Sequence, residues 1–147
     1  MNTIKDIWFD ANRIYVKIDD EKTFSRPLEA FPLLKDASDK ERLDFKIGKF
    51  GDDVRWESLD EDIHISSFFE TVEPDYENEI AMIFKRFPQL NVSEVARSMG
   101  INKSLLSKYI YGIKKPSDMR KMQIKEALHI LGKQSYHHSQ ASCSPIT

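Results

Sequence analysis

The stretch that decides the fold of the second half of the chain reads NVSEVARSMGINKSLLSKYIY, residues 91–111. It predicts two short helices joined by a tight turn. Asn91 and Asn102 can each cap a helix start, and Glu94 stands where the acid of a capping box belongs. Gly100 lies where a helix stop needs a left-handed backbone, which glycine adopts without a Cβ clash. The residues expected to face inward are apolar and recur at helical spacing: Val95, Met99, Ile101, Leu105 or Leu106, and Tyr109.

The residues left on the outer side of the second predicted helix are polar or basic, so they can meet phosphate groups or base edges. Asn102 and Lys103 lie at its N-terminal end, the end that would enter the major groove of DNA. Residues 111–117 (YGIKKPS) then predict a loop that could lay two lysines on the phosphate backbone. A plain helical hairpin, in which Gly100 is only a stop signal, is the alternative. The predicted DNA-binding residues are Asn102, Lys103, Ser104, Ser107, Lys108, Tyr111, Lys114 and Lys115.

This spacing resembles the helix-turn-helix of the lambda-repressor-like (Cro-type) DNA-binding domains. Ala96 and Gly100 stand at the small-residue and turn positions of that motif, and residues 111–117 resemble its basic loop. Residues 77–87 predict an amphipathic helix that would pack behind the motif. Residues 117–131 predict the longest helix, with Gly132 as its stop. The resemblance implies an all-α fold for this half and major-groove reading by the helix at residues 102–111.

Length and composition bound the remaining choices. The chain has 147 residues, enough for two small domains, and is 40% hydrophobic and 31% charged. No apolar run approaches the ~18 residues that a membrane span needs, and the first residues lack the basic start and apolar core of a signal peptide. Cys143 is the one cysteine, so an intrachain disulfide is excluded. These features favour a soluble cytoplasmic protein with no membrane contact.

The net charge of −2 conceals two halves of opposite sign. Residues 1–75 carry 11 Lys and Arg against 19 Asp and Glu, whereas residues 76–147 carry 11 against 5. An acidic half joined to a basic half is expected of a regulator with a separate DNA-binding module. The alternative is that the acidic surface only keeps the protein soluble.

The first half predicts an α+β fold of antiparallel strands with one short helix. Residues 13–18 (RIYVKI) alternate apolar and polar side chains, the period of a half-buried strand. Residues 4–9 and 23–26 predict strands that short turns can join to it, and Ser38-Asp-Lys-Glu41 is a capping box that opens the helix. Two more strands are predicted, over residues 45–50 and 54–56, and Trp8 and Trp56 are both expected in the core.

Three parts of this half resemble a small bacterial family of unknown function, DUF2442: residues 26–34 (RPLEAFPLL), Arg42, and residues 54–65 (VRWESLDEDIHI). The resemblance covers roughly residues 4–70, and some members carry a Cro-like helix-turn-helix behind this domain. It implies a fold and a two-part layout but no activity. The predicted domains are residues 1–72 (α+β), residues 73–134 (helix-turn-helix) and residues 135–147 (a disordered polar tail), because Pro74 lies in a short polar segment that suits a boundary.

The sequence lacks the motifs of common catalytic and cofactor sites. Residues 60–62 (Asp-Glu-Asp) form an acidic cluster near His64, but consecutive side chains point in different directions on any regular backbone. We expect these acids to cap the next element or to pair with Arg42 or Arg55. The sequence therefore predicts neither an enzyme nor a metal site, and no cofactor.

Together these patterns predict a bacterial transcription regulator that binds double-stranded DNA. We expect a homodimer, because a single module of this kind makes few base contacts. The alternative is a protein-interaction or antitoxin-like module whose acidic N-terminal domain binds a basic protein partner. The two functions are compatible in one chain.

Overall fold

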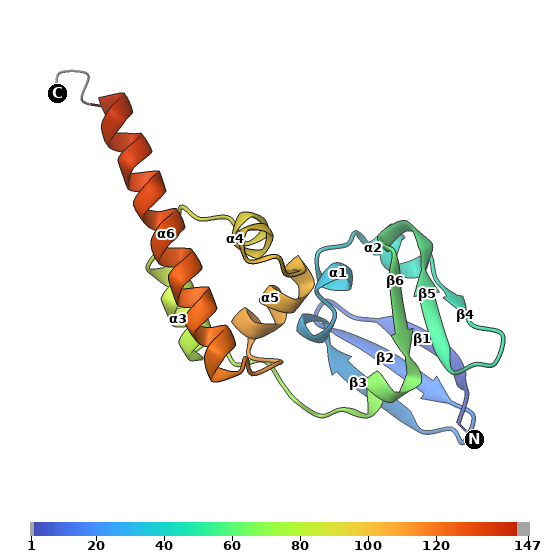
Figure 1. The fold of residues 1–147 in the computed structure, drawn as a ribbon. Helices are drawn as coiled ribbons and strands as arrows, with labels where there is room; N and C mark the ends of the chain where they lie inside the picture. The colour runs from blue at the N-terminus through green and yellow to red at the C-terminus, as the bar shows by residue number, and fades with distance from the viewer. Residues whose placement is uncertain (1, 144–147) are drawn as a thin grey trace. The chain divides into compact units, whose positions relative to one another are not determined.

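The computed structural model describes residues 2–143, and the side chains of residues 2–133. The chain divides into two compact units, unit 1 (Met1–Pro74) and unit 2 (Asp75–Thr147). Unit 1 contains antiparallel sheets and unit 2 contains helices (Figure 1). This arrangement confirms the predicted α+β fold class for a strand-rich first region followed by a helical one.

The first sheet of unit 1 is an antiparallel meander in the order β1-β2-β3. Its strands are β1 (Ile4–Phe9), β2 (Arg13–Ile18) and β3 (Thr23–Pro27). The alternation predicted for residues 13–18 is confirmed: buried and half-buried side chains alternate along β2, as expected when successive side chains point to opposite faces of a sheet. The buried side chains of β2 are Ile14, Val16 and Ile18.

The second sheet has the order β4-β5-β6 and is also antiparallel. Its strands are β4 (Lys46–Ile47), β5 (Asp53–Trp56) and β6 (Glu61–His64). β4 is shorter than the strand predicted over residues 45–50, because the turn already begins at Gly48, whose N–H donates to the Asp53 carbonyl at 2.9 Å. A Cβ atom on Gly48 would overlap the Asp53 carboxylate, so a larger residue there would have to displace that side chain.

Short helices connect the strands of unit 1. The predicted capping box is confirmed: the Glu41 N–H donates to the Ser38 hydroxyl at 3.1 Å, and the Ser38 N–H donates to the Glu41 carboxylate at 2.9 Å. This box starts the helix that carries Arg42. The short helices are η1 (Leu28–Ala30), α1 (Pro32–Lys35), α2 (Asp39–Leu43), η2 (Glu57–Leu59) and η3 (Ile65–Phe69).

The two tryptophans of unit 1 occupy different environments. Trp56 is fully buried, and its indole N–H donates to the Arg42 carbonyl at 2.8 Å, which satisfies its one polar atom. Trp8 is 38% exposed, so the prediction that it belongs to the core is wrong. Its ring instead stacks on that of Tyr15, the residue paired with it on β2.

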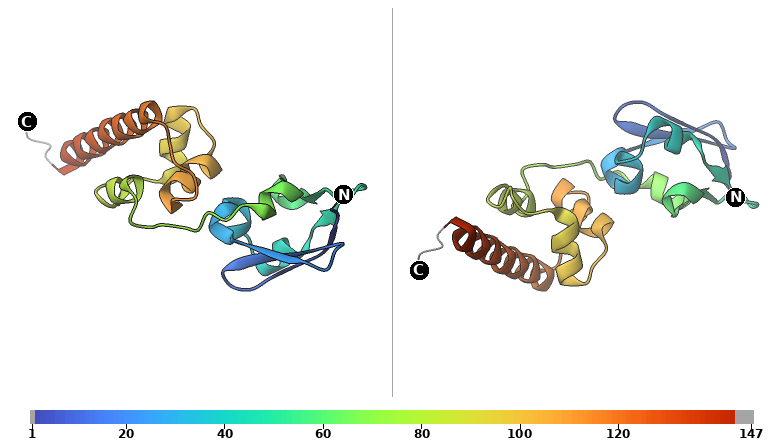
Figure 2. Two further views of the ribbon diagram at one scale, coloured as in Figure 1. Left: turned by 90° about the horizontal axis from the view of Figure 1, so that it is seen from below. Right: turned by 90° about the horizontal axis from the view of Figure 1, so that it is seen from above.

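Unit 2 consists of helices. Both views of Figure 2 show two short helices, α4 (Val92–Met99) and α5 (Lys103–Tyr111), beside the longer helix α6 (Asp118–Cys143). α4 contacts both α5 and α6, and α3 contacts the same two helices. The described helices are α3 (Glu79–Lys85), α4 (Val92–Met99), α5 (Lys103–Tyr111) and α6 (Asp118–Cys143). Their shared core contains Ile80, Val95, Ala96, Leu106, Tyr109, Ile124 and Leu128.

The helix stop predicted at Gly132 is wrong, because α6 continues to Cys143. Gly132 has a packing role: a Cβ atom there would lie 2.6 Å from Cε1 of Phe87. Glycine therefore lets the helix and the aromatic ring approach closely. Within the predicted disordered tail, residues 135–143 belong to α6, and residues 144–147 lie outside the described part of the chain.

The two cores can be perturbed separately. Leu106→Ala removes a fully buried side chain from unit 2 and should lower its free energy of unfolding by about 2–5 kcal/mol. Far-UV circular dichroism, dominated by the helices of unit 2, should show the shifted denaturation midpoint. Tryptophan fluorescence should not shift, because both tryptophans lie in unit 1.

The matched variant is Leu34→Ala, which removes an equally buried leucine from unit 1. It should shift the fluorescence transition and leave the helical transition in place. Identical shifts of both signals in both variants would contradict independent cores.

Candidate nucleic-acid interface

Side-chain caps begin both α4 and α5, and a left-handed glycine joins the two helices. The Asn91 side chain accepts the Ser93 N–H at 2.7 Å, so Asn91 caps α4 as predicted. Glu94 lies at the expected position in the first turn, but the Asn91 side chain does not accept its N–H as it would in a capping box. Gly100 has φ of 68°, the left-handed conformation predicted for the turn. The Asn102 side chain then accepts the Leu105 N–H at 3.1 Å and caps α5. The first turn of α5 is therefore stabilised by the residue that precedes the helix.

Backbone hydrogen bonds also stabilise the C-terminal end of α5. Gly112 adopts φ of 76°, and the N–H groups of Ile113 and Lys114 both donate to the Lys108 carbonyl, at 3.0 and 3.3 Å. The same carbonyl also accepts the N–H of the cap residue Gly112, so three consecutive N–H groups converge on it. These bonds tie the loop carrying Lys114 and Lys115 to the last turn of α5.

The first residues of unit 2 reinforce the same end of α5. The Asp75 N–H donates to the Tyr111 carbonyl at 2.8 Å, and the Asn78 side-chain amide donates to the Ile110 carbonyl at 2.8 Å. The Tyr76 and Tyr111 rings meet edge to face with centroids 5.9 Å apart. The start of the unit and the end of α5 thus form one hydrogen-bonded cluster.

The structure brings most of the predicted DNA-binding residues to α5, its cap and the loop that follows. Ser107 is different: the sequence placed it outward, but its side chain is buried and only 6% exposed. We therefore leave Ser107 out of the candidate interface. Those exposed are Asn102, Lys103, Lys114 and Lys115, and those half-buried are Ser104, Lys108 and Tyr111.

The charges within the sequence from α4 to the loop after α5 have one sign. Residues 95–117 contain five Lys and Arg residues and no Asp or Glu. Arg97, which is exposed on α4, belongs to this set and was not among the residues predicted from the motif. The absence of carboxylates over the whole stretch is the sequence signal that could have found it. A surface with this charge attracts polyanions over distances of about a Debye length, ~10 Å at 0.1 M salt.

Unit 1 offers a contrast, because several of its acids pair with one arginine within the unit. The Arg55 guanidinium contacts the carboxylates of Glu57, Asp60 and Asp62 at 2.9, 2.9 and 2.7 Å. Hydrogen bonds to Glu57 and Asp60 raise the pKa of Arg55, and the bond from Arg55 lowers the pKa of Glu57. The pairing predicted between the acidic cluster and Arg55 is confirmed.

A metal site is not formed by this cluster. Within the described residues, no three His, Cys, Asp or Glu side chains come together in a way that could hold a metal ion. His64 accepts the Ser66 N–H on Nδ1 at 3.1 Å and so caps η3. The Nδ1 atom of His64 is therefore engaged in capping the short helix that follows β6.

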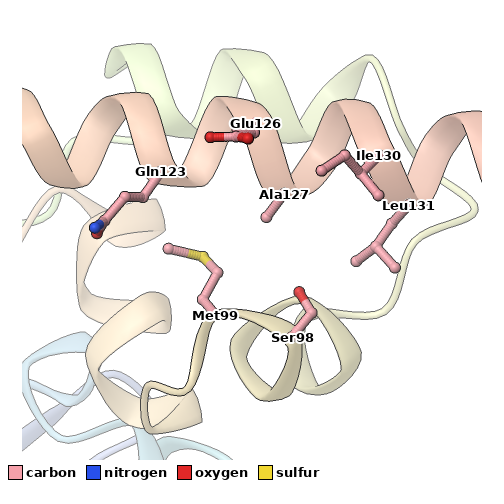
Figure 3. Close-up of a pocket in the computed structure, with 7 residues that line it drawn as sticks. All are labelled: Ser98, Met99, Gln123, Glu126, Ala127, Ile130 and Leu131. Carbon is pink, nitrogen blue, oxygen red and sulfur yellow. The ribbon is translucent and has the colours of Figure 1, made fainter.

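A separate hollow of about 420 Å³ in unit 2 lies between the end of α4 and α6 (Figure 3). Met99 points into it from one side, and Ala127 and Leu131 point into it from the other. It contains none of the predicted DNA-binding residues, so it is not part of the candidate interface. The remaining residues that line it are Ser98, Gln123, Glu126 and Ile130.

Comparisons with known proteins bear on unit 1 alone. Residues 4–73 match the family described as "Protein of unknown function (DUF2442)", which supports the resemblance found for the N-terminal domain. No curated protein and no solved structure matched the chain. Among the described residues, no helix is long and apolar enough to cross a membrane.

The two left-handed glycines that bracket α5 should differ in their tolerance of a side chain. Gly100→Ala meets open space and should cost only the left-handed strain, about 1–2 kcal/mol of unfolding free energy. Gly112→Ala should cost more, because its Cβ would lie 2.6 Å from the Asp75 carbonyl oxygen. Urea denaturation followed by circular dichroism measures both. Equal losses in the two variants would show that the contact with Asp75 is not maintained in solution.

Proposed function

We propose that this protein binds double-stranded DNA through unit 2 and acts as a bacterial transcription regulator. In this proposal α4 and α5 form a lambda-repressor-like helix-turn-helix, and α5 enters the major groove by its N-terminal end. The observation that carries the proposal is the run of residues 95–117, which contains five Lys and Arg residues and no Asp or Glu, on a helix that is capped at both ends.

Each exposed residue has a role that its chemistry supports. Lys103, in the first turn of α5, would donate to guanine, and Asn102 would read adenine or hold a phosphate while it caps the helix. Lys114 and Lys115 would contact phosphates from the loop and so position the helix without reading sequence. Ser104, Lys108 and Tyr111 lie further along α5 and would contact the edges of the same site.

Two copies on a pseudo-palindromic site are expected under this proposal. One module presents few residues to base edges, and dimeric readers place equivalent helices one helical turn of DNA apart, about 10 base pairs. Selection of bound fragments from a random DNA pool would reveal both the recognised bases and their spacing.

A second candidate function is a protein-interaction module, antitoxin-like in layout, in which unit 1 binds a partner. The observation that favours it is the charge of unit 1: residues 1–74 carry 18 Asp and Glu against 11 Lys and Arg. Such a surface repels nucleic acid and favours a basic protein. The two functions use different units and can operate together.

Lysine substitution on α5 tests DNA binding directly. The double variant Lys103→Ala/Lys108→Ala should bind a pool of duplex fragments more weakly. The slope of log affinity against log salt should fall in magnitude by about 1 for each of the two lysines that contacts a phosphate and not a base. The matched control is Lys5→Ala/Lys22→Ala, which removes two exposed lysines from unit 1. Intact protein that ignores DNA at low salt would refute the proposal.

Substitution of Asn102 separates capping from base reading. Asn102→Ser keeps a side-chain oxygen for the Leu105 N–H, so unfolding stability should be retained, whereas Asn102→Ala should lose about 1 kcal/mol. If the amide reads adenine, Asn102→Ser should relax the preference at one base position by about 1–3 kcal/mol. An unchanged selection profile would restrict Asn102 to capping.

A further inference from the structure

A groove in unit 1 opens between the end of β1 and α2. Its volume is about 520 Å³. One wall comes from the end of β1 and the turn after it, and the other from a single helix, so both walls belong to regular or tightly hydrogen-bonded backbone. The lining residues are Trp8, Phe9, Asp10, Ala11, Asp39, Arg42 and Leu43.

Two large apolar side chains that line this groove remain exposed to water. Trp8 is 38% exposed, and Leu43 is 66% exposed. The Trp8 ring stacks on Tyr15 with centroids 5.7 Å apart and planes 6° apart, which fixes the indole as a flat platform. A solvent-exposed platform of this kind is typical of a binding surface, because aromatic side chains are enriched at interfaces.

A carboxylate is held beside the platform in a set position. Asp10 accepts the Tyr15 hydroxyl at 2.6 Å and the backbone N–H groups of Asn12 and Arg13 at 2.8 and 2.7 Å. These bonds, the one from Tyr15 foremost, hold the pKa of the Asp10 carboxyl below its usual value. Asp10 is therefore ionised at neutral pH, and its position is fixed before any ligand arrives.

A second carboxylate stands on the opposite wall. Asp39 is the first residue of α2, and its side chain is 98% exposed. The nearby cation, Arg42, is only 13% exposed, and its guanidinium donates to the carbonyls of Leu34 and Lys35 at 2.8 Å each. It lies 3.7 Å from Asp39, a weak pairing that leaves the outer side of this carboxylate to solvent.

We propose that this groove binds an arginine-bearing, partly apolar segment of a basic protein partner. A guanidinium is planar, so it can stack on the Trp8 indole near the charge of Asp10 while it donates to the exposed Asp39 carboxylate. Leu43, Phe9 and Ala11 offer apolar surface to the residue next to that arginine. The overall excess of acids in unit 1 complements such a partner and disfavours a nucleic acid in the same groove. The proposal deepens the second candidate function and does not rest on DNA binding.

The test uses the intact chain and two synthetic peptides. One peptide is Gly-Leu-Arg-Leu-Arg-Gly with both ends blocked, and the other carries citrulline, a neutral isostere, in place of each arginine. Titration is followed by NMR on the Trp8 indole and on the backbone N–H groups of Asp39 and Leu43. The arginine peptide should give saturable shifts at these groups, and the citrulline peptide should bind at least about fivefold more weakly.

Two substitutions locate the site. Trp8→Leu should weaken the arginine peptide about two- to fivefold, and Asp39→Asn should weaken it by a similar factor. Phe50→Leu and Asp19→Asn are the matched controls, since both residues are exposed in unit 1 and neither lines the groove. They should leave peptide affinity unchanged. Asp39→Asn alters one exposed side chain, so it decides the question even if Trp8→Leu destabilises the sheet.

Several outcomes would overturn the proposal. They are equal binding of the two peptides, shifts confined to residues outside the groove, and unchanged affinity in Asp39→Asn. Shifts of the Trp8 resonance with protein concentration alone would assign the groove to a second copy of this chain instead. DNA affinity of the same variants is measured in parallel. It should not fall, because none of the substitutions removes a residue of the candidate interface, so failure here is distinguishable from failure of DNA binding.

Discussion

The hydrogen bonds that clamp α5 at its two ends are the constraint on which the rest of unit 2 depends. Asn102 fixes the first turn, and the Gly112 turn fixes the last through Ile113, Lys114 and the backbone of Asp75. A helix this short would be marginal by itself, because nucleation is costly. Its caps and its buried face make it rigid, so the side chains on its outer face keep a constant spacing. That constancy is what recognition of a regular polymer requires.

Unit 1 depends on arginines in a comparable way. Arg42 holds the carbonyls at the end of α1, and the buried Arg26 donates to the Val72 carbonyl at 2.7 Å. Arg13 contacts the Glu73 carboxylate at 2.6 Å, and Arg55 gathers three acids. All four arginines of residues 1–74 thus bind backbone carbonyls or carboxylates of the same unit. Carboxylates such as Asp39 then remain outside, which gives the surface its acidic character.

The parts of the structure that follow local rules could be predicted from the sequence. The alternation of β2, the Ser38 capping box and the left-handed turn at Gly100 each depend on residues within one element. The errors share another cause. Gly132 looked like a helix stop, but Phe87, far away in sequence, packs against it. Trp8 looked like a core residue because of its type, and Ser107 looked outward because of its position on one helix. Whether such a residue is buried, exposed or in contact depends on how other elements of the fold pack around it. The pattern within one stretch of sequence does not show this packing.

The separation of charge between the units also has a consequence for how the two proposed activities would act on each other. The excess of 18 acids over 11 bases on residues 1–74 creates a negative field that opposes the approach of DNA within about a Debye length, ~10 Å at 0.1 M salt. A basic partner on unit 1 would neutralise part of that field. Partner binding and DNA binding would favour each other to the extent that the partner's charges lie within that distance of the bound DNA, and by reciprocity DNA would strengthen partner binding by the same factor. This coupling requires no change of shape, because it follows from charge alone, and it would weaken as salt is added.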